Sequence, residues 1–142
     1  MAITQAVCNS FKSQLLEAVH DFESGGDVFK LALYLSSATL DAATTNYTVS
    51  GEVSATGTYS AGGGVLQSQQ VSLDAGVGIV DFADLSFTGV TLTARGALIY
   101  NATETNKAVC ALDFGADKTA TSGTFTIQFP AFTSSAAILR IA

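Results

Sequence analysis

The sequence predicts a mainly β fold of the α+β class, in which an N-terminal amphipathic helix packs on an antiparallel β-sandwich or barrel-like domain. Apolar residues recur at steps of three or four only near the N-terminus. After residue 28, short stretches alternate apolar and polar residues and are separated by turns rich in Gly, Ser and Thr. A chain of 142 residues can bury one core, so residues 1–142 are expected to form a single domain.

The predicted helix lies within residues 1–24. Its apolar stripe combines helical steps of three and four, and runs through Ile3, Val7, Phe11, Leu15, Val19 and Phe22. The segment Ser24-Gly25-Gly26-Asp27 is expected to end it, because glycine disfavours helix.

The first predicted strand covers residues 28–35, "VFKLALYL", with Phe29, Leu31, Leu33 and Leu35 on its buried face. Residues 36–64 then form a long segment of Ser, Thr, Ala and Gly with few apolar anchors. Long irregular segments are uncommon inside compact domains and often have a function. We interpret this one as a loop or extended arm that adds to the sheet edge of a neighbouring molecule.

Residues 65–142 are predicted to form the antiparallel β core. Its strands are expected over residues 65–73, 77–82, 90–101, 107–114, 124–131 and 136–141. The third and fourth flank the polar run "ATETN" and predict a hairpin. The outward face of residues 90–101 changes from polar to apolar along its length, which suggests that it passes under a neighbour or a partner subunit.

Two similar stretches, "VDFAD" and "LDFGADKTATSG", carry the aspartates that invite a metal hypothesis. Asp113-Phe114-Gly115 spells the magnesium-binding tripeptide of protein kinases, but the nucleotide loop and catalytic loop of kinases are absent. We interpret the second stretch as a β corner that turns at Gly115 and is capped by an aspartate. The alternative is a Ca²⁺ site, if the two stretches meet, with the candidate ligands Asp81, Asp84, Asp113 and Asp117.

No motif predicts catalysis or a cofactor. His20 is the only histidine and is interpreted as a surface or helix-end residue. Cys8 and Cys110 are interpreted as small buried hydrophobes, with a disulfide as the alternative. The run Ala61-Gly62-Gly63-Gly64 lacks the Lys-Ser/Thr of a phosphate loop. We therefore expect no enzyme and no cofactor.

The charge content points to assembly. Charged residues make up 13% of the chain, against about 25% in a typical soluble domain, which suggests that part of the surface is buried against other chains. The net charge of −6 and the scattered cations disfavour nucleic acid and anionic membranes as partners. A homo-oligomer is expected. The interface candidates are Tyr47, Tyr59, Arg95 and Ile99, although Arg95 is alternatively paired with one of the aspartates.

Long phrases of the sequence resemble a family of small proteins encoded by tailed bacteriophages. They include "VCNSFKSQLLEAVHDF", "FKLALYLSSATLDAATTNYTVSGEV" and "VDFADLSFTGVTLTARGALIYN", and the similarity covers nearly the whole chain. The resemblance implies a virion structural protein whose partners are other virion proteins. The N-terminal stretch "MAITQAVCNSFKSQ" lacks the features of a signal peptide, so we expect synthesis and assembly in the host cytoplasm.

Three functions remain open at this point. The first is a capsid decoration (cement) protein that binds the major capsid protein and stabilises the head. The second is a tail, neck or fibre-attachment component. The third is a host-surface module that binds glycans through its loop tips, for which Tyr34, Tyr47, Tyr59 and Tyr100 are the available polar aromatic residues.

Overall fold

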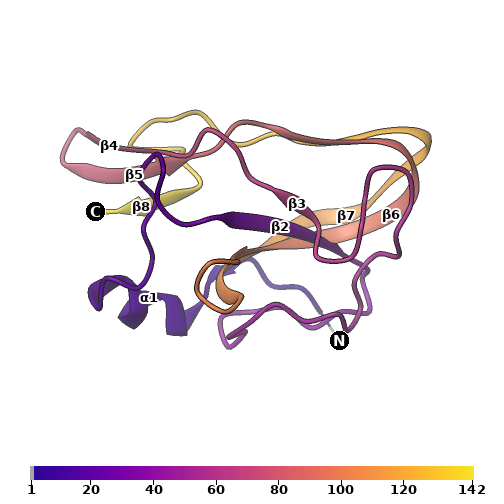
Figure 1. The fold of residues 1–142 in the computed structure, drawn as a ribbon, viewed down its shortest axis with the longest axis horizontal. Helices are drawn as coiled ribbons and strands as arrows, with labels where there is room; N and C mark the ends of the chain where they lie inside the picture. The colour runs from indigo at the N-terminus through magenta and orange to yellow at the C-terminus, as the bar shows by residue number, and fades with distance from the viewer. Residues whose placement is uncertain (1) are drawn as a thin grey trace.

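The computed structural model describes residues 2–142, and it is mainly β with antiparallel pairing. A five-stranded sheet has the order β1-β7-β6-β2-β3 and a three-stranded sheet the order β4-β5-β8; neither sheet closes on itself (Figure 1). The larger sheet contains β1 (Ala6–Val7), β2 (Phe29–Tyr34), β3 (Gly64–Val65), β6 (Leu85–Asn101) and β7 (Lys107–Ile127). The smaller contains β4 (Gln70–Asp74), β5 (Val77–Asp81) and β8 (Leu139–Ile141).

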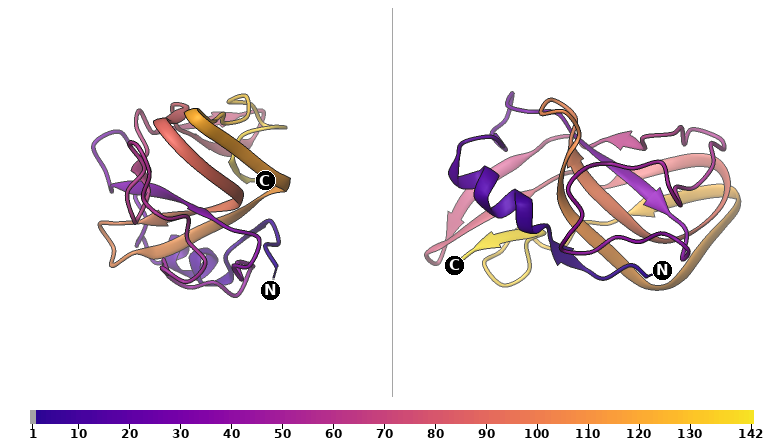
Figure 2. Two further views of the ribbon diagram at one scale, coloured as in Figure 1. Left: turned by 90° about the vertical axis from the view of Figure 1, so that its right-hand side faces the viewer. Right: turned by 90° about the horizontal axis from the view of Figure 1, so that it is seen from below.

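The β6–β7 hairpin dominates the fold and is much longer than predicted. The expected hairpin around "ATETN" is confirmed, but β7 continues without interruption to Ile127. The two strands bend together over their length, as Figure 2 shows. The expected corner at Gly115 is therefore wrong, and the predicted strands 107–114 and 124–131 belong largely to one strand.

The residues that resembled a corner form a bulge instead. Pairing advances two residues on β6, from Ala94 to Gly96, while it advances five on β7, from Lys118 to Asp113. Gly115 lies within this bulge at φ +81°, a conformation that glycine adopts without steric cost. Glycine thus bends the strand here and does not end it.

The N-terminal helix is shorter than its apolar stripe predicted. Helix α1 covers Asn9–Leu16, and Ala6–Val7 instead pair with β7 as strand β1. Ala18 takes φ +62° directly after the C-cap, so the chain leaves the helix well before the glycines at 25 and 26. Ile3 and Phe22, at the two ends of the stripe, are buried but lie outside the helix.

Strand β2 lies at the centre of the core. It pairs with β6 on one side and β3 on the other, and five of its six residues are buried. Both of its faces are therefore covered, where we expected full burial of one face only. Residues 65–73 divide between β3 and β4, whereas β5 and β8 fall within their predicted segments.

Residues 36–64 form a loop, as expected, but they do not extend from the domain as an arm. The loop packs against the larger sheet, and Ala38, Leu40, Val53 and Tyr59 are all at most 5% exposed. Backbone bonds tie it to β2, because the N–H of Val53 donates to the carbonyl of Leu33 and that of Leu35 to Gly51. Leu40, Val53 and Tyr59 therefore anchor the loop from inside, whereas Val49 is exposed.

Candidate functional site

A polar cluster of the 36–64 loop surrounds the Glu52 carboxylate. Its Oε1 accepts the hydroxyl of Tyr47 at 2.5 Å, and its Oε2 accepts the hydroxyl of Tyr59 and the N–H of Gly62, each at 2.7 Å. The Tyr100 hydroxyl donates to the carbonyl of Gly62, and its ring stacks on Tyr47. Together with Tyr34, whose hydroxyl donates to Thr48, all four tyrosines of the chain hold the 36–64 loop against the sheet.

This cluster uses the tyrosines internally. Tyr34, Tyr59 and Tyr100 are at most 2% exposed, and burial raises the pKa of all four hydroxyls, that of Tyr100 to about 12. Each hydroxyl is thus a neutral donor at physiological pH. Tyr59 is not available as an interface residue, and only half-buried Tyr47 retains exposed surface. Sequence reasoning missed Glu52, whose signal was its place as the only glutamate between two tyrosines in the loop.

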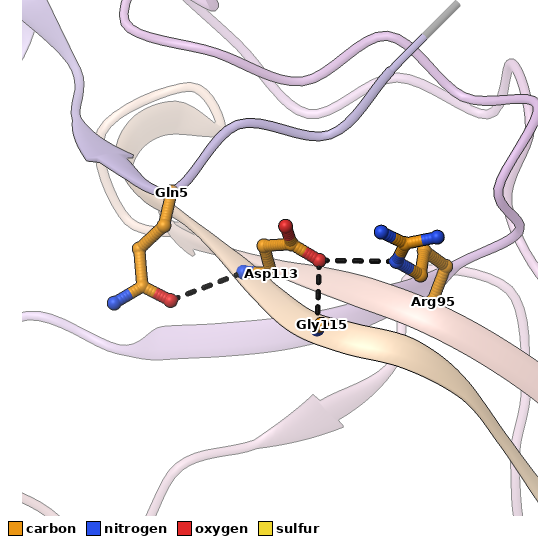
Figure 3. Close-up of polar contacts among 4 residues, drawn as sticks. All are labelled: Gln5, Arg95, Asp113 and Gly115. Carbon is orange, nitrogen blue, oxygen red and sulfur yellow. Dashed lines mark hydrogen bonds and ion pairs between the residues drawn. The ribbon is translucent and has the colours of Figure 1, made fainter.

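Arg95 pairs with an aspartate, which was one of the two interpretations of this residue. Its Nε donates to Oδ1 of Asp113 at 3.1 Å, and the same oxygen accepts the N–H of Gly115 at 2.9 Å (Figure 3). Gln5 approaches from the segment beside β1, and its Oε1 accepts the Asp113 N–H. The Gly115 N–H, followed by the guanidinium, lowers the pKa of Asp113. The contacts fix the β7 bulge to β6 and to the N-terminal segment.

The other calcium candidates do not assemble with Asp113 into a ligand set. Asp81 ends β5 in the smaller sheet, whereas Asp113 and Asp117 lie on β7 in the larger one. Oδ1 of Asp84 accepts the N–H of Phe129 at 2.9 Å. Within residues 2–142, no three His, Cys, Asp or Glu side chains are grouped so that they could hold a metal ion.

Ile99 lies in the core of the monomer. It is fully buried on β6, between Leu31 of β2 and Cys110 of β7 in the register of the sheet. The outward face of this strand becomes apolar where the chain itself buries it, since Ala97 and Ile99 are both fully buried. Ile99 is therefore not an interface residue.

His20 is buried, contrary to expectation, and it joins three parts of the chain. Its Nε2 is 2.9 Å from Oε1 of Gln14 and its Nδ1 is 3.0 Å from Nδ2 of Asn101. Oδ1 of Asn101 accepts the N–H groups of Thr103 and Glu104, so the amide nitrogen must face the histidine. Nδ1 is consequently an acceptor and Nε2 carries the proton, which makes the imidazole neutral. Burial lowers its pKa.

Both cysteines are free and buried, as the first interpretation proposed. Burial raises the pKa of Cys8 to about 11 and that of Cys110 to about 12. Thiolate is the nucleophilic form, so neither group is set up for covalent chemistry near neutral pH.

No protein-family model, no curated protein and no solved structure matches this chain. In the described part of the chain no helix is long and apolar enough to cross a membrane.

Proposed function

We propose that this chain is a structural protein of a tailed-bacteriophage virion, and that it acts as a cement protein on the capsid by binding other virion proteins. The low charge content and the phrases that resemble small phage proteins support the proposal. We further interpret the two sheets as an open β-sandwich-like body. The observation that carries the proposal is an open strand edge on β7.

The open edge covers residues 115–127. β7 pairs with β6 along one side, but on its other side β1 pairs only with Cys110 and Ala111. Nine of the thirteen residues from 115 to 127 are exposed. A strand edge of this kind presents unpaired backbone N–H and C=O groups, which are the groups that a strand from another chain binds.

The corresponding edge of β6 is covered by the chain itself, unlike the edge of β7. The 36–64 loop covers β6: Thr58 donates its N–H to the carbonyl of Thr88, and the hydroxyls of Thr58 and Thr56 accept the N–H groups of Thr88 and Thr91. The chain therefore covers one side of its long hairpin with its own loop and leaves the other side open.

The charge distribution along the β7 edge also suits controlled strand addition. Asp117 and Lys118 lie at the bulge, where charges and irregular backbone discourage indiscriminate pairing. Residues 119–127 contain no charged side chain. An extended segment of a neighbouring shell protein would add to this part of the strand and hold adjacent subunits together against the pressure of the packaged DNA.

The position in the particle is tested on virions of the phage whose genome encodes the chain. Quantitative mass spectrometry gives its copy number, and a reconstruction at low resolution locates it. Many copies distributed over the head would support the cement function. A single ring of copies on the tail or neck would assign the alternative structural function, and absence from the particle would overturn the virion proposal.

The edge itself is tested by proline at two adjacent exposed positions, Lys118→Pro and Thr119→Pro. Successive N–H groups of a strand point to opposite sides, so one proline removes a bond to β6 and the other only alters the open edge. The variant that keeps its fold by circular dichroism is expected to lose incorporation into particles. Normal incorporation of that folded variant would refute strand addition at β7.

A further inference from the structure

A second surface, unrelated to the β7 edge, lies between helix α1 and the three-stranded sheet. It is an open groove of about 550 Å³ with a mostly apolar lining. Leu15 and Leu16 line it from the helix, and Val71 and Ile141 line it from the sheet. Figure 1 shows α1 on the same side of the molecule as β4, β5 and β8.

The sheet face that forms the floor of this groove has no polar side chain. In the strand register, Val71, Val80 and Leu139 form one row and Leu73, Gly78 and Ile141 form the next. Residues paired across antiparallel strands point to the same face, so all six share it. A sheet face left to solvent normally carries polar residues.

The exposed large apolar residues of the molecule concentrate here. Leu16 is 90% exposed, Leu73 74% and Ile141 61%, and five of the nine exposed large hydrophobic residues within residues 2–142 surround this groove; the five are Val7, Leu16, Val71, Leu73 and Ile141. Contiguous apolar patches on soluble proteins mark binding surfaces, because water contact with them is unfavourable.

The patch carries both a projection and a recess. Leu16 projects from the helix wall, whereas Gly78 leaves a recess in the floor: a Cβ placed on Gly78 meets only Ile141, at 3.9 Å. In a two-fold contact the same patch serves both subunits, so a projection and a recess on one patch can engage each other reciprocally.

The charges at the groove also favour self-association. The protein carries a net charge of −6, which opposes contact between two copies over most of the surface. The groove is different, because Lys12 and Glu23 line it with one charge of each sign. Two copies that meet here avoid like-charge repulsion, and each offers both signs to the other.

We propose that the groove between α1 and the β4-β5-β8 sheet is a homodimer interface, in which the apolar sheet faces of two copies cover each other. This contact goes beyond the proposed virion function, since it forms in purified protein with no other virion component. Failure of the dimer would leave the β7 proposal standing, and absence from virions would leave the dimer standing.

The test is the mass of the purified protein by sedimentation equilibrium over a range of concentrations. The wild type is expected to reach twice the mass of the 14.5 kDa chain. Leu73→Lys is expected to weaken association at least tenfold, because it places a charge on the face that the two copies would bury in the dimer. Val49→Lys is the matched control: Val49 is 71% exposed, nearly the same as Leu73, but lies in the 36–64 loop, so this variant should dimerise normally.

A second measurement needs no substitution. In the wild type, hydrogen exchange of β4, β8 and the C-terminal turn of α1 should slow as the protein concentration rises, while exchange in the 36–64 loop stays constant. A monomeric wild type at all concentrations, or equal weakening by Leu73→Lys and Val49→Lys, would overturn the proposal. A wild type that stays monomeric at all concentrations would indicate that the groove binds a different protein.

Discussion

The 36–64 loop and the β4-β5-β8 sheet contradict what their compositions suggest. The loop is rich in Ser, Thr, Ala and Gly, yet Leu40 is fully buried and Tyr59 is 1% exposed. The sheet has regular apolar strands, yet Leu73 and Ile141 are more than half exposed. Hydrogen bonding explains part of this difference in burial, because the loop carries a carboxylate and tyrosine hydroxyls that bond to one another in the interior. The sheet has only aliphatic groups on its open face, where Leu139 is buried but Val71, Leu73 and Ile141 remain exposed.

Glycine substitution should give the largest contrast between these regions. Gly63 and Gly76 have nearly the same φ, +82° and +80°, but a Cβ on Gly63 would lie 1.8 Å from the carbonyl oxygen of Leu31, whereas one on Gly76 meets nothing within 4 Å. We expect Gly63→Ala to cost at least about 4 kcal/mol in free energy of unfolding or to prevent folding. Gly76→Ala should cost only about 1 kcal/mol, the penalty of the left-handed backbone. Urea denaturation measures both, and equal losses would contradict the close packing of the loop on β2.

Removal of the Glu52 carboxylate should have the next largest effect. Glu52→Ala leaves the hydroxyls of Tyr47 and Tyr59 and the N–H of Gly62 without their acceptor. We expect a loss of about 3 kcal/mol in free energy of unfolding, because buried donors without partners are costly. Glu17→Ala, at an exposed site after α1, is the control and should change stability by less than about 0.5 kcal/mol. A loss below about 1 kcal/mol for Glu52→Ala would mean that the cluster does not hold the loop.

His20 lies at the inner end of the groove beside the small sheet and should make stability depend on pH. It is bonded to α1 and β6 in the interior. Protonation would place an N–H on Nδ1 against the amide N–H of Asn101, and burial also opposes the charge. Asp27, which accepts from Asn101, favours protonation, whereas Lys107 opposes it.

The sign follows from the lowered pKa of the folded state. The unfolded chain takes up a proton as the pH falls through about 6.5, while the folded protein resists it. The contribution of neutral His20 is thus fully present above pH 6.5 and declines as the pH falls toward the folded pKa, with a slope of at most about 1.4 kcal/mol per pH unit. His20→Asn keeps an acceptor but does not titrate in this range, so its unfolding free energy should vary less between pH 7 and 5. The same pH dependence in both proteins would contradict the tautomer deduced here.

The sequence was informative where local pattern determines structure. Alternation predicted β2, β5 and the hairpin around "ATETN". For Arg95 the sequence left two alternatives, a subunit interface or an aspartate partner, and the structure has the second. It failed where contacts distant in sequence decide. The apolar stripe at residues 3–22 has helical spacing, yet β7 pairs with Ala6 and Val7 and draws that part into the sheet. Likewise, no local signal separates a corner from a bulge at Gly115, because the difference depends on whether β6 continues alongside.

Contacts between residues distant in sequence also limited the prediction of the candidate site, as the hydrogen bonds of Asn101 show. His20 is 81 positions from Asn101, so spacing in the sequence cannot reveal their contact, and an isolated histidine after a helix resembles a surface residue. The sequence pointed to part of the Glu52 cluster, since two of its tyrosines, Tyr47 and Tyr59, are among the interface candidates. Their inward direction depends on the position of the loop over β2 and β6, which only the tertiary structure determines.

The smallest effect on the free energy of unfolding is expected for a leucine substitution in the small sheet, and the same substitution in the core provides the comparison. Leu73→Thr removes an apolar group that is already 74% exposed and replaces it with a good strand former, so unfolding at concentrations below dimerisation should change by less than about 0.5 kcal/mol. Leu33→Thr is the matched substitution in β2, where the side chain is fully buried, and it should cost about 3 kcal/mol because it combines a cavity with a hydroxyl in the core.

The same pair of variants should reverse its order when association is measured. Leu73→Thr removes apolar surface from the proposed dimer interface and should weaken dimerisation, whereas Leu33→Thr lies outside that interface and should leave the association of the folded fraction unchanged. Chemical denaturation at low protein concentration and sedimentation at high concentration separate the two quantities. If Leu73→Thr instead destabilised the monomer as much as Leu33→Thr, the β4 face would be covered within the chain itself, and both the contrast with the loop and the proposed dimer surface would be wrong.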